Sequence, residues 1–174
     1  MAKVSFTKLG LKTNQEIRCI ECNEQIIEVK QYLPINDKLE LISNVINASH
    51  DDNNFANPVK VSVFTALEIA YSYTNINFTD KQKEDPTKLY DMLTSSGLMS
   101  LIFDTIPENE LGAVFNGVKD SVEAIYTYRN SVLGILESIS ADYSQLNFDA
   151  EEIQKKLGDP NNMTFLKEVL TKLG

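Results

Sequence analysis

The period of the hydrophobic pattern changes once along this chain, at Pro34, and that change most constrains the fold. Before Pro34, residues 15–33 alternate apolar and charged side chains in two runs, with a polar break at residues 23–25. Such alternation predicts an antiparallel β-hairpin with strands near residues 15–21 and 25–33. Pro34 is expected to end the second strand, because it lacks the N–H that a ladder requires.

After Pro34 the apolar residues recur at helical spacing. The pattern predicts a helix after Pro34 that ends before His50, with Asn36 as its N-cap and Asp37 in its first turn. Further helices are predicted over residues 58–75, 86–93 and 98–106, for about thirty residues from 108, and in two short segments after 149 and 159. The chain is therefore expected to be mainly α, one domain over residues 1–174 with a hairpin (15–33) and a helical body (35–174).

The helix predicted over residues 58–75 is expected to be central. Three polar residues recur at every third position and predict a narrow solvent-facing stripe: Ser62, Thr65 and Glu68. The apolar residues between them are predicted to belong to the core: Val63, Phe64, Leu67 and Ala70. Further on, Thr79 and Gln82 have the spacing of a capping box.

A heptad-spaced stripe marks the long helix that begins at residue 108. Its members follow a 4-3-4-3 spacing: Leu111, Phe115, Val118, Val122, Ile125, Arg129, Val132, Leu136 and Ile139. A stripe of this length must meet a partner, which is either another helix of the same chain or a second copy. Arg129 could set the register between copies, or its side chain could extend to a carboxylate at the edge of an intramolecular seam. The stripe from Leu111 to Leu136 is the candidate protein interface.

The charge balance limits the partners that this chain can bind. Sixteen Lys and Arg against twenty-five Asp and Glu give a net charge of −9 and a pI near 4.6. An acidic surface repels phosphate backbones, which argues against nucleic-acid binding. No apolar run approaches the roughly 20 residues of a membrane-spanning helix, and the first residues lack a signal-peptide pattern. We therefore expect a soluble protein made in a cytoplasm, with no membrane partner.

The two cysteines form a lone C-x-x-C that invites a redox or metal role. Cys19 and Cys22 straddle the predicted hairpin tip, and His50 is the one other soft ligand in the sequence. A structural zinc site requires four ligands, and a thioredoxin-type pair lies at a helix N-terminus. Two incidental thiols in a reducing compartment are therefore the favoured interpretation.

A second cluster, His50-Asp51-Asp52, could supply a general base or metal ligands. A calcium loop that starts at Asp51 would need Gly at its sixth position and Glu at its twelfth, where this chain has Ala56 and Ser62. Phosphate-binding loops, nucleophile elbows and zincin motifs do not occur in the sequence. The sequence therefore predicts no enzymatic activity, no cofactor or metal, and no small-molecule ligand.

Several short stretches together carry a family resemblance that extends from about Leu9 to the C-terminus. They are residues 28–35 (EVKQYLPI), 38–42 (KLELI), 73–76 (YTNI), 78–80 (FTD), 88–91 (KLYD) and 95–98 (SSGL). In them the chain resembles small acidic proteins encoded among the head and tail genes of bacteriophages that infect low-GC Gram-positive bacteria. Some of these are described as tail-assembly-chaperone-like. One departure lies at the hairpin tip, where Cys22-Asn23-Glu24 stands in place of the expected Asn-Gly turn.

The resemblance implies a non-enzymatic virion structural or morphogenesis protein, either a tail-assembly chaperone or a head or tail component. Its partners would be phage structural proteins and copies of itself, in the host cytoplasm during assembly or in the virion. An alternative is a host-directed inhibitor that uses its acidity to occupy a basic host protein. A third hypothesis, a small enzyme or metal-dependent switch, would require His50, Asp51 and Cys22 to converge.

Overall fold

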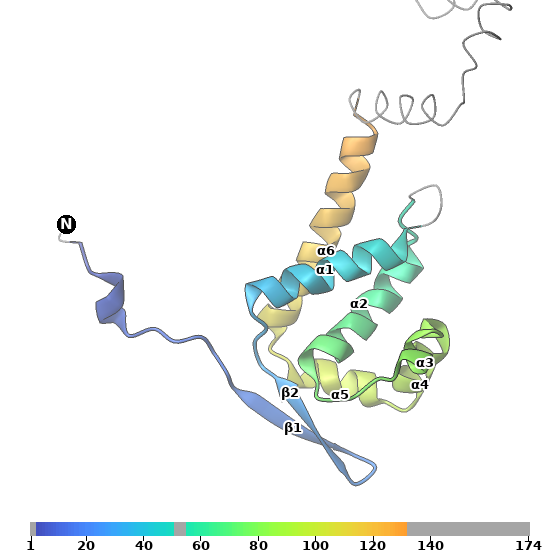
Figure 1. Ribbon diagram of the computed structural model, residues 1–174, viewed down its shortest axis with the longest axis horizontal. Helices are drawn as coiled ribbons and strands as arrows, with labels where there is room; N and C mark the ends of the chain where they lie inside the picture. Colours follow the sequence, from blue (N-terminus) through green and yellow to red (C-terminus); the bar gives the residue numbers. More distant parts are fainter. Residues whose placement is uncertain (1–2, 51–54, 132–174) are drawn as a thin grey trace, which may run out of the picture. The chain divides into compact units, whose positions relative to one another are not determined.

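The computed structural model describes residues 3–50 and 55–131 of the chain (Figure 1). Their elements are a 3₁₀ helix η1 (Phe6–Leu9), strands β1 (Ile17–Cys22) and β2 (Gln25–Lys30), and helices α1 (Ile35–Ser49), α2 (Pro58–Tyr73), α3 (Asp80–Lys83), α4 (Pro86–Ser95), α5 (Leu98–Thr105) and α6 (Glu108–Arg129). The protein is thus mainly α with an N-terminal antiparallel β-hairpin, which confirms the predicted fold class.

Backbone contacts group the chain into two units, Met1–Tyr126 and Thr127–Gly174, and nearly all described residues belong to the first. The two short helices predicted after residues 149 and 159 lie outside the described residues. A single domain over all 174 residues stays a prediction.

The hairpin turns through two residues. The strands pair from Ile17 with Lys30 to Cys22 with Gln25, so Asn23 and Glu24 alone form the turn. Both have positive φ, 49° and 63°, which is the signature of a type I′ turn whose twist matches that of the strands. Asn tolerates this left-handed backbone, whereas Glu24 occupies the position where glycine is usual.

The second strand is shorter than predicted. It ends at Lys30, four residues before Pro34, because the chain then turns inward and buries Gln31 and Leu33. The outer edge of β2 is joined to the end of α2, since Glu28 N–H donates to Asn75 Oδ1 at 3.0 Å and Asn75 N–H to the Glu28 carbonyl at 3.2 Å. The α2 terminus therefore holds the hairpin in place.

Helix α1 begins two residues earlier than the predicted cap allows. Pro34 is its N-cap and Asn36 lies inside the first turn, so the assignment of Asn36 as the cap was wrong. The fixed φ of proline, here −54°, lets the helix start directly after it. Asp37 does lie in the first turn, as predicted.

Helix α2 lies against α1, α4 and α5 and forms the centre of the core (Figure 1). Leu67 and Ala70 are buried as predicted, and Val63 and Phe64 are half-buried and pack against the core. Thr65 was expected to face solvent but is 1% exposed. Its hydroxyl donates to the Val61 carbonyl at 2.6 Å, and this satisfied donor lets the side chain enter the core.

A buried carboxylate joins the start of α6 to the rest of the core. Glu110 Oε1 accepts from the Leu33 N–H at 2.8 Å and from the Tyr73 hydroxyl at 2.9 Å, and Lys38 Nζ lies 2.9 Å from each of its oxygens. Burial raises the pKa of Tyr73 far above its ordinary value, and the hydrogen bond to Glu110 raises it further, so the hydroxyl keeps its proton. Lys38 also lies 4.5 Å from the centre of the Tyr32 ring.

Replacing Glu24 should remove the backbone cost of the turn. Glu24→Gly is expected to stabilise the protein by up to about 1 kcal/mol, because glycine adopts positive φ without a Cβ clash. Urea unfolding midpoints give this difference. The control is Glu21→Gly within β1, which should destabilise, and a loss of stability in Glu24→Gly would contradict the argument.

Removing the Glu110 carboxylate should be far more costly. Glu110→Ala leaves a largely buried ammonium, a buried hydroxyl and a buried N–H without their acceptor, so a loss of about 3–5 kcal/mol is expected. The control, Glu108→Ala, removes an exposed carboxylate from the same helical turn and should cost at most about 1 kcal/mol. Equal losses in guanidinium unfolding would contradict a special role for Glu110.

Candidate functional site

An apolar groove of about 340 Å³ lies between the first half of α2 and the middle of α6. On the α2 side, the groove begins near Asn57, which caps the helix. The Asn57 side-chain oxygen accepts hydrogen bonds from the N–H groups of Val59 and Lys60. Residues from both helices line the groove: Ala56, Pro58, Val61, Ser62 and Thr65 on one side and Phe115, Val118, Lys119, Val122 and Glu123 on the other.

The polar groups of the α2 wall are already used within the helix. The Ser62 hydroxyl donates to the Pro58 carbonyl at 3.1 Å, and Thr65 donates to Val61. These hydroxyl protons are therefore engaged by the backbone, and the wall presents mainly carbon to an occupant. A groove of this kind suits apolar side chains.

The α6 wall is an aromatic and aliphatic ridge with a charged rim. Phe115 meets Phe103 of α5 edge to face, with ring centroids 6.2 Å apart, and keeps 42% of its surface exposed. On the rim, Lys119 Nζ and Glu123 Oε1 are 3.8 Å apart and both side chains are well exposed. Such a pair is weak in water, so it can exchange partners at little cost.

The structure divides the predicted interface stripe between the core, the groove and the surface. Its first six members take three environments: Val118 is buried; Leu111, Val122 and Ile125 are half-buried; Phe115 and Arg129 are exposed. Val132, Leu136 and Ile139 lie outside the described residues. The buried face of α6 instead follows Glu110, Val114 and Val118, an i, i+4, i+8 spacing that the heptad pattern missed. The assignment of the stripe as an interface stays a prediction.

Within the described residues, the candidate redox and metal-binding side chains do not come together. Cys19 is exposed and Cys22 packs against the core, because residues three apart on a strand point to opposite faces. His50 Nδ1 lies within hydrogen-bond distance of the Ile46 carbonyl, and Asp51 and Asp52 lie outside the described residues. Across residues 3–50 and 55–131, no three His, Cys, Asp or Glu side chains are grouped so that they could hold a metal ion.

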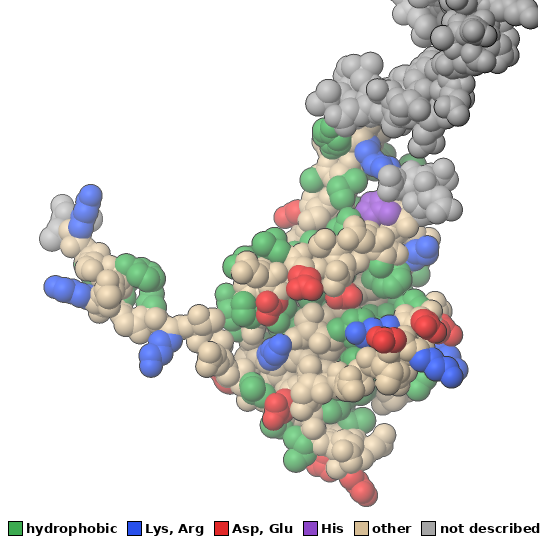
Figure 2. Space-filling model, viewed as in Figure 1, with side chains coloured by type: hydrophobic (Ala, Val, Ile, Leu, Met, Phe, Trp, Pro, Cys, Tyr) green, Lys and Arg blue, Asp and Glu red, His purple; other side chains and the backbone are tan. Residues whose placement is uncertain are grey.

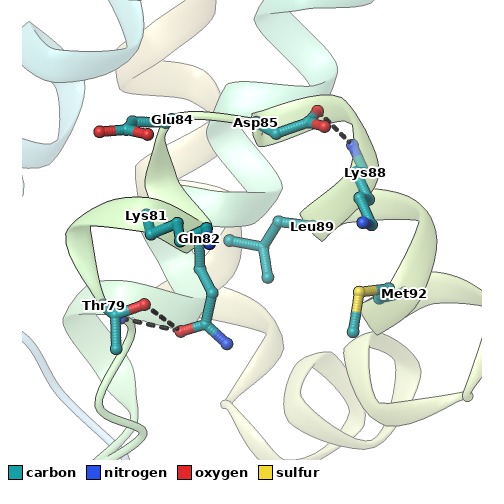
Figure 3. A pocket seen from close by; sticks show the side chains of 8 residues that line it. All are labelled: Thr79, Lys81, Gln82, Glu84, Asp85, Lys88, Leu89 and Met92. Atoms are coloured by element: carbon teal, nitrogen blue, oxygen red, sulfur yellow. Dashed lines mark hydrogen bonds between the residues drawn. The ribbon is translucent and has the colours of Figure 1, made fainter.

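A second hollow, of about 490 Å³, lies beside α3 and α4 (Figure 3). Thr79 donates to Gln82 Oε1 through its N–H at 2.8 Å and its hydroxyl at 3.0 Å, which confirms the predicted pairing. Asp85 accepts from the Lys88 N–H at 3.1 Å and caps α4. The Thr79–Gln82 pair therefore caps α3, and the Asp85–Lys88 pair caps α4. Two lysines and two carboxylates share the lining, so neither charge sign dominates: Lys81, Lys88, Glu84 and Asp85.

Comparison of the chain with protein-family models, with curated proteins and with solved structures found no match. Of the helices in the described part of the chain, none has the length and apolar character that would let it cross a membrane.

Gly117 sets how closely α6 approaches α1 just beside the groove. A Cβ built at this position would lie 2.6 Å from Ile42 Cδ1, whereas a Cβ at Gly112, one and a half turns earlier, would meet nothing within 4 Å. Absence of a side chain at Gly117 thus leaves room for Ile42. Gly112 has no such neighbour and simply weakens the helix.

The two glycines should respond differently to a methyl group. Gly112→Ala is expected to stabilise the protein by about 0.5–1 kcal/mol, because alanine is the better helix former. Gly117→Ala should stabilise the protein less than this or destabilise it, because the Ile42 side chain must move. In an Ile42→Val background, which lacks Cδ1, Gly117→Ala should stabilise the protein about as much as Gly112→Ala does. Equal effects of both glycine substitutions in urea unfolding would contradict the close approach.

Proposed function

We propose that this chain is a non-enzymatic bacteriophage virion or morphogenesis protein that acts through protein–protein association. The observation that supports this most strongly is the α2–α6 groove, because Phe115, Val118 and Val122 line it and all three belong to the predicted interface stripe. Hydrophobic grooves between helices are recurrent docking sites for short apolar segments of other chains.

Exposed apolar side chains beyond the groove support the same proposal. On α6, Tyr126 is 60% and Tyr128 46% exposed, and on α1, Ile35 and Leu39 are 63% and 58% exposed. Figure 2 shows apolar and acidic side chains side by side over α1. Each pair adds exposed apolar surface to its helix, and such surface is available for association.

The resemblance to head and tail proteins of phages supports the biological setting of this association. The partners that we propose are phage structural proteins and copies of the chain itself, met in the host cytoplasm during assembly or in the virion. The acidic composition supports a protein partner over a nucleic acid.

A charge placed in the groove should abolish the association. Phe115→Asp is expected to reduce capture of coexpressed phage head and tail proteins at least about tenfold, because it removes the aromatic surface that an occupant would contact and puts in its place a carboxylate that must lose its water when the groove is filled. Leu101→Asp is the matched control, since Leu101 is 44% exposed on α5 and lies outside the groove. Thermal melts establish that both variants fold.

Two results would contradict the proposal. One is a wild-type chain that stays monomeric in light scattering and captures no head or tail protein. The other is selective capture of a basic host protein, with binding that weakens steeply as salt is raised, which would favour the host-directed inhibitor. Mass spectrometry of purified virions then separates a resident component from a chaperone.

A further inference from the structure

The N-terminal arm, defined as residues 3–14, is apolar yet packs on nothing. All of its side chains are exposed, with Phe6 at 75%, Leu9 at 52% and Leu11 at 69%. Gly, Ser and charged residues would lose little by this exposure, whereas four of the twelve residues are apolar side chains whose contact with water is unfavourable. The arm therefore has the composition of a segment that binds a surface.

The arm also has a preformed shape. Phe6 and Leu9 are the ends of the 3₁₀ helix η1, and residues three apart eclipse one another in such a helix. Lys8 N–H donates to the Ser5 carbonyl at 3.0 Å, and Gly10 ends the turn with a φ of 60°. The two apolar side chains thus project from one edge as a short plug.

Charge distinguishes the arm from the rest of the chain. Residues 1–14 hold three of the sixteen basic residues and none of the twenty-five acidic ones, so the remainder has a net charge of −12. Figure 2 shows blue and green side chains together along this segment. A basic, apolar arm is complementary to the acidic body of another copy.

We propose that the arm of one copy docks in the α2–α6 groove of a second copy, with Phe6 and Leu9 seated between the two helices. The groove of about 340 Å³ suits a short apolar plug better than a globular surface. The rim carboxylate of Glu123, whose contact with Lys119 is long at 3.8 Å, is available to the arm's lysines. The proposal names the occupant of the groove and in this respect rests on the proposed function.

Arm exchange of this kind has a structural consequence. The arm and the groove are different surfaces, so the contact is heterologous and each copy offers both a donor and an acceptor. Heterologous contacts generate closed rings when the rotation closes and filaments when it does not. Repeating assemblies of this chain therefore follow from one contact.

The first experiment measures association of the full chain by sedimentation velocity over a hundredfold concentration range. Phe6→Asp with Leu9→Asp should weaken self-association at least about tenfold, because both plug residues become charged. Ile26→Asp is the matched control, since Ile26 is 71% exposed on the hairpin and belongs to neither surface. Lys8→Glu with Lys12→Glu should also weaken association, which tests charge complementarity.

The second experiment locates the contact by crosslinking between copies. In a Cys19→Ser, Cys22→Ser background, one copy carries Thr7→Cys in the arm and another carries Ser62→Cys in the groove. Mixing the two with a short bismaleimide should give a Thr7–Ser62 crosslinked heterodimer. Thr94→Cys, exposed on α4 and outside the groove, should give none.

The outcomes separate this inference from the proposed function. A wild-type chain that is monomeric at every concentration overturns the inference, as does a mixture of the Thr7→Cys and Ser62→Cys copies that gives no crosslinked heterodimer. Self-association that survives Phe6→Asp with Leu9→Asp also overturns it, but leaves the proposed function standing if phage proteins are still captured through Phe115. Loss of that capture with intact self-association would instead contradict the proposed function.

Discussion

The contact on which the other features depend is the buried carboxylate of Glu110. This carboxylate accepts hydrogen bonds from the Leu33 N–H, the Lys38 ammonium and the Tyr73 hydroxyl. It therefore links the segment after the hairpin, α1 and the end of α2 to the first turn of α6. A buried ion pair gains little net stability over apolar packing, but its geometry admits few alternatives. Its contribution here is position: α6 must start where three donors converge.

The groove follows from how α6 departs from that point. Val114 and Val118 continue the buried face that Glu110 begins, yet from Lys119 onward no described residue of α6 is buried. Gly117 lets the helix lie close to Ile42 on one side, while the space toward α2 stays open and is lined by apolar groups. The same helix thus closes the core at its start and forms one wall of an open groove further along.

The sequence predicted most elements, because their signals are local. The alternation before Pro34, the capping pair Thr79 and Gln82 and the prolines that begin helices each act within a few residues. The burial of Thr65 and the central role of Glu110 were not predicted, since each depends on partners brought close by folding: a backbone carbonyl for one, three distant donors for the other. At the α2–α6 groove, the heptad spacing had identified three of the residues that line the α6 wall: Phe115, Val118 and Val122.

The charge of the chain bears on how copies could meet. Two copies whose residues 15–174 each carry a net charge of −12 repel at short range, and this repulsion extends over a Debye length of about 8 Å at physiological salt. A face-to-face contact would place those charges together, whereas the five residues between the Phe6–Leu9 plug and residue 15 span up to about 17 Å when extended, about twice the Debye length. An arm carries three positive charges to the neighbour while the bodies remain apart. For an acidic chain, association through a basic arm therefore avoids the cost that a broad body-to-body interface would incur.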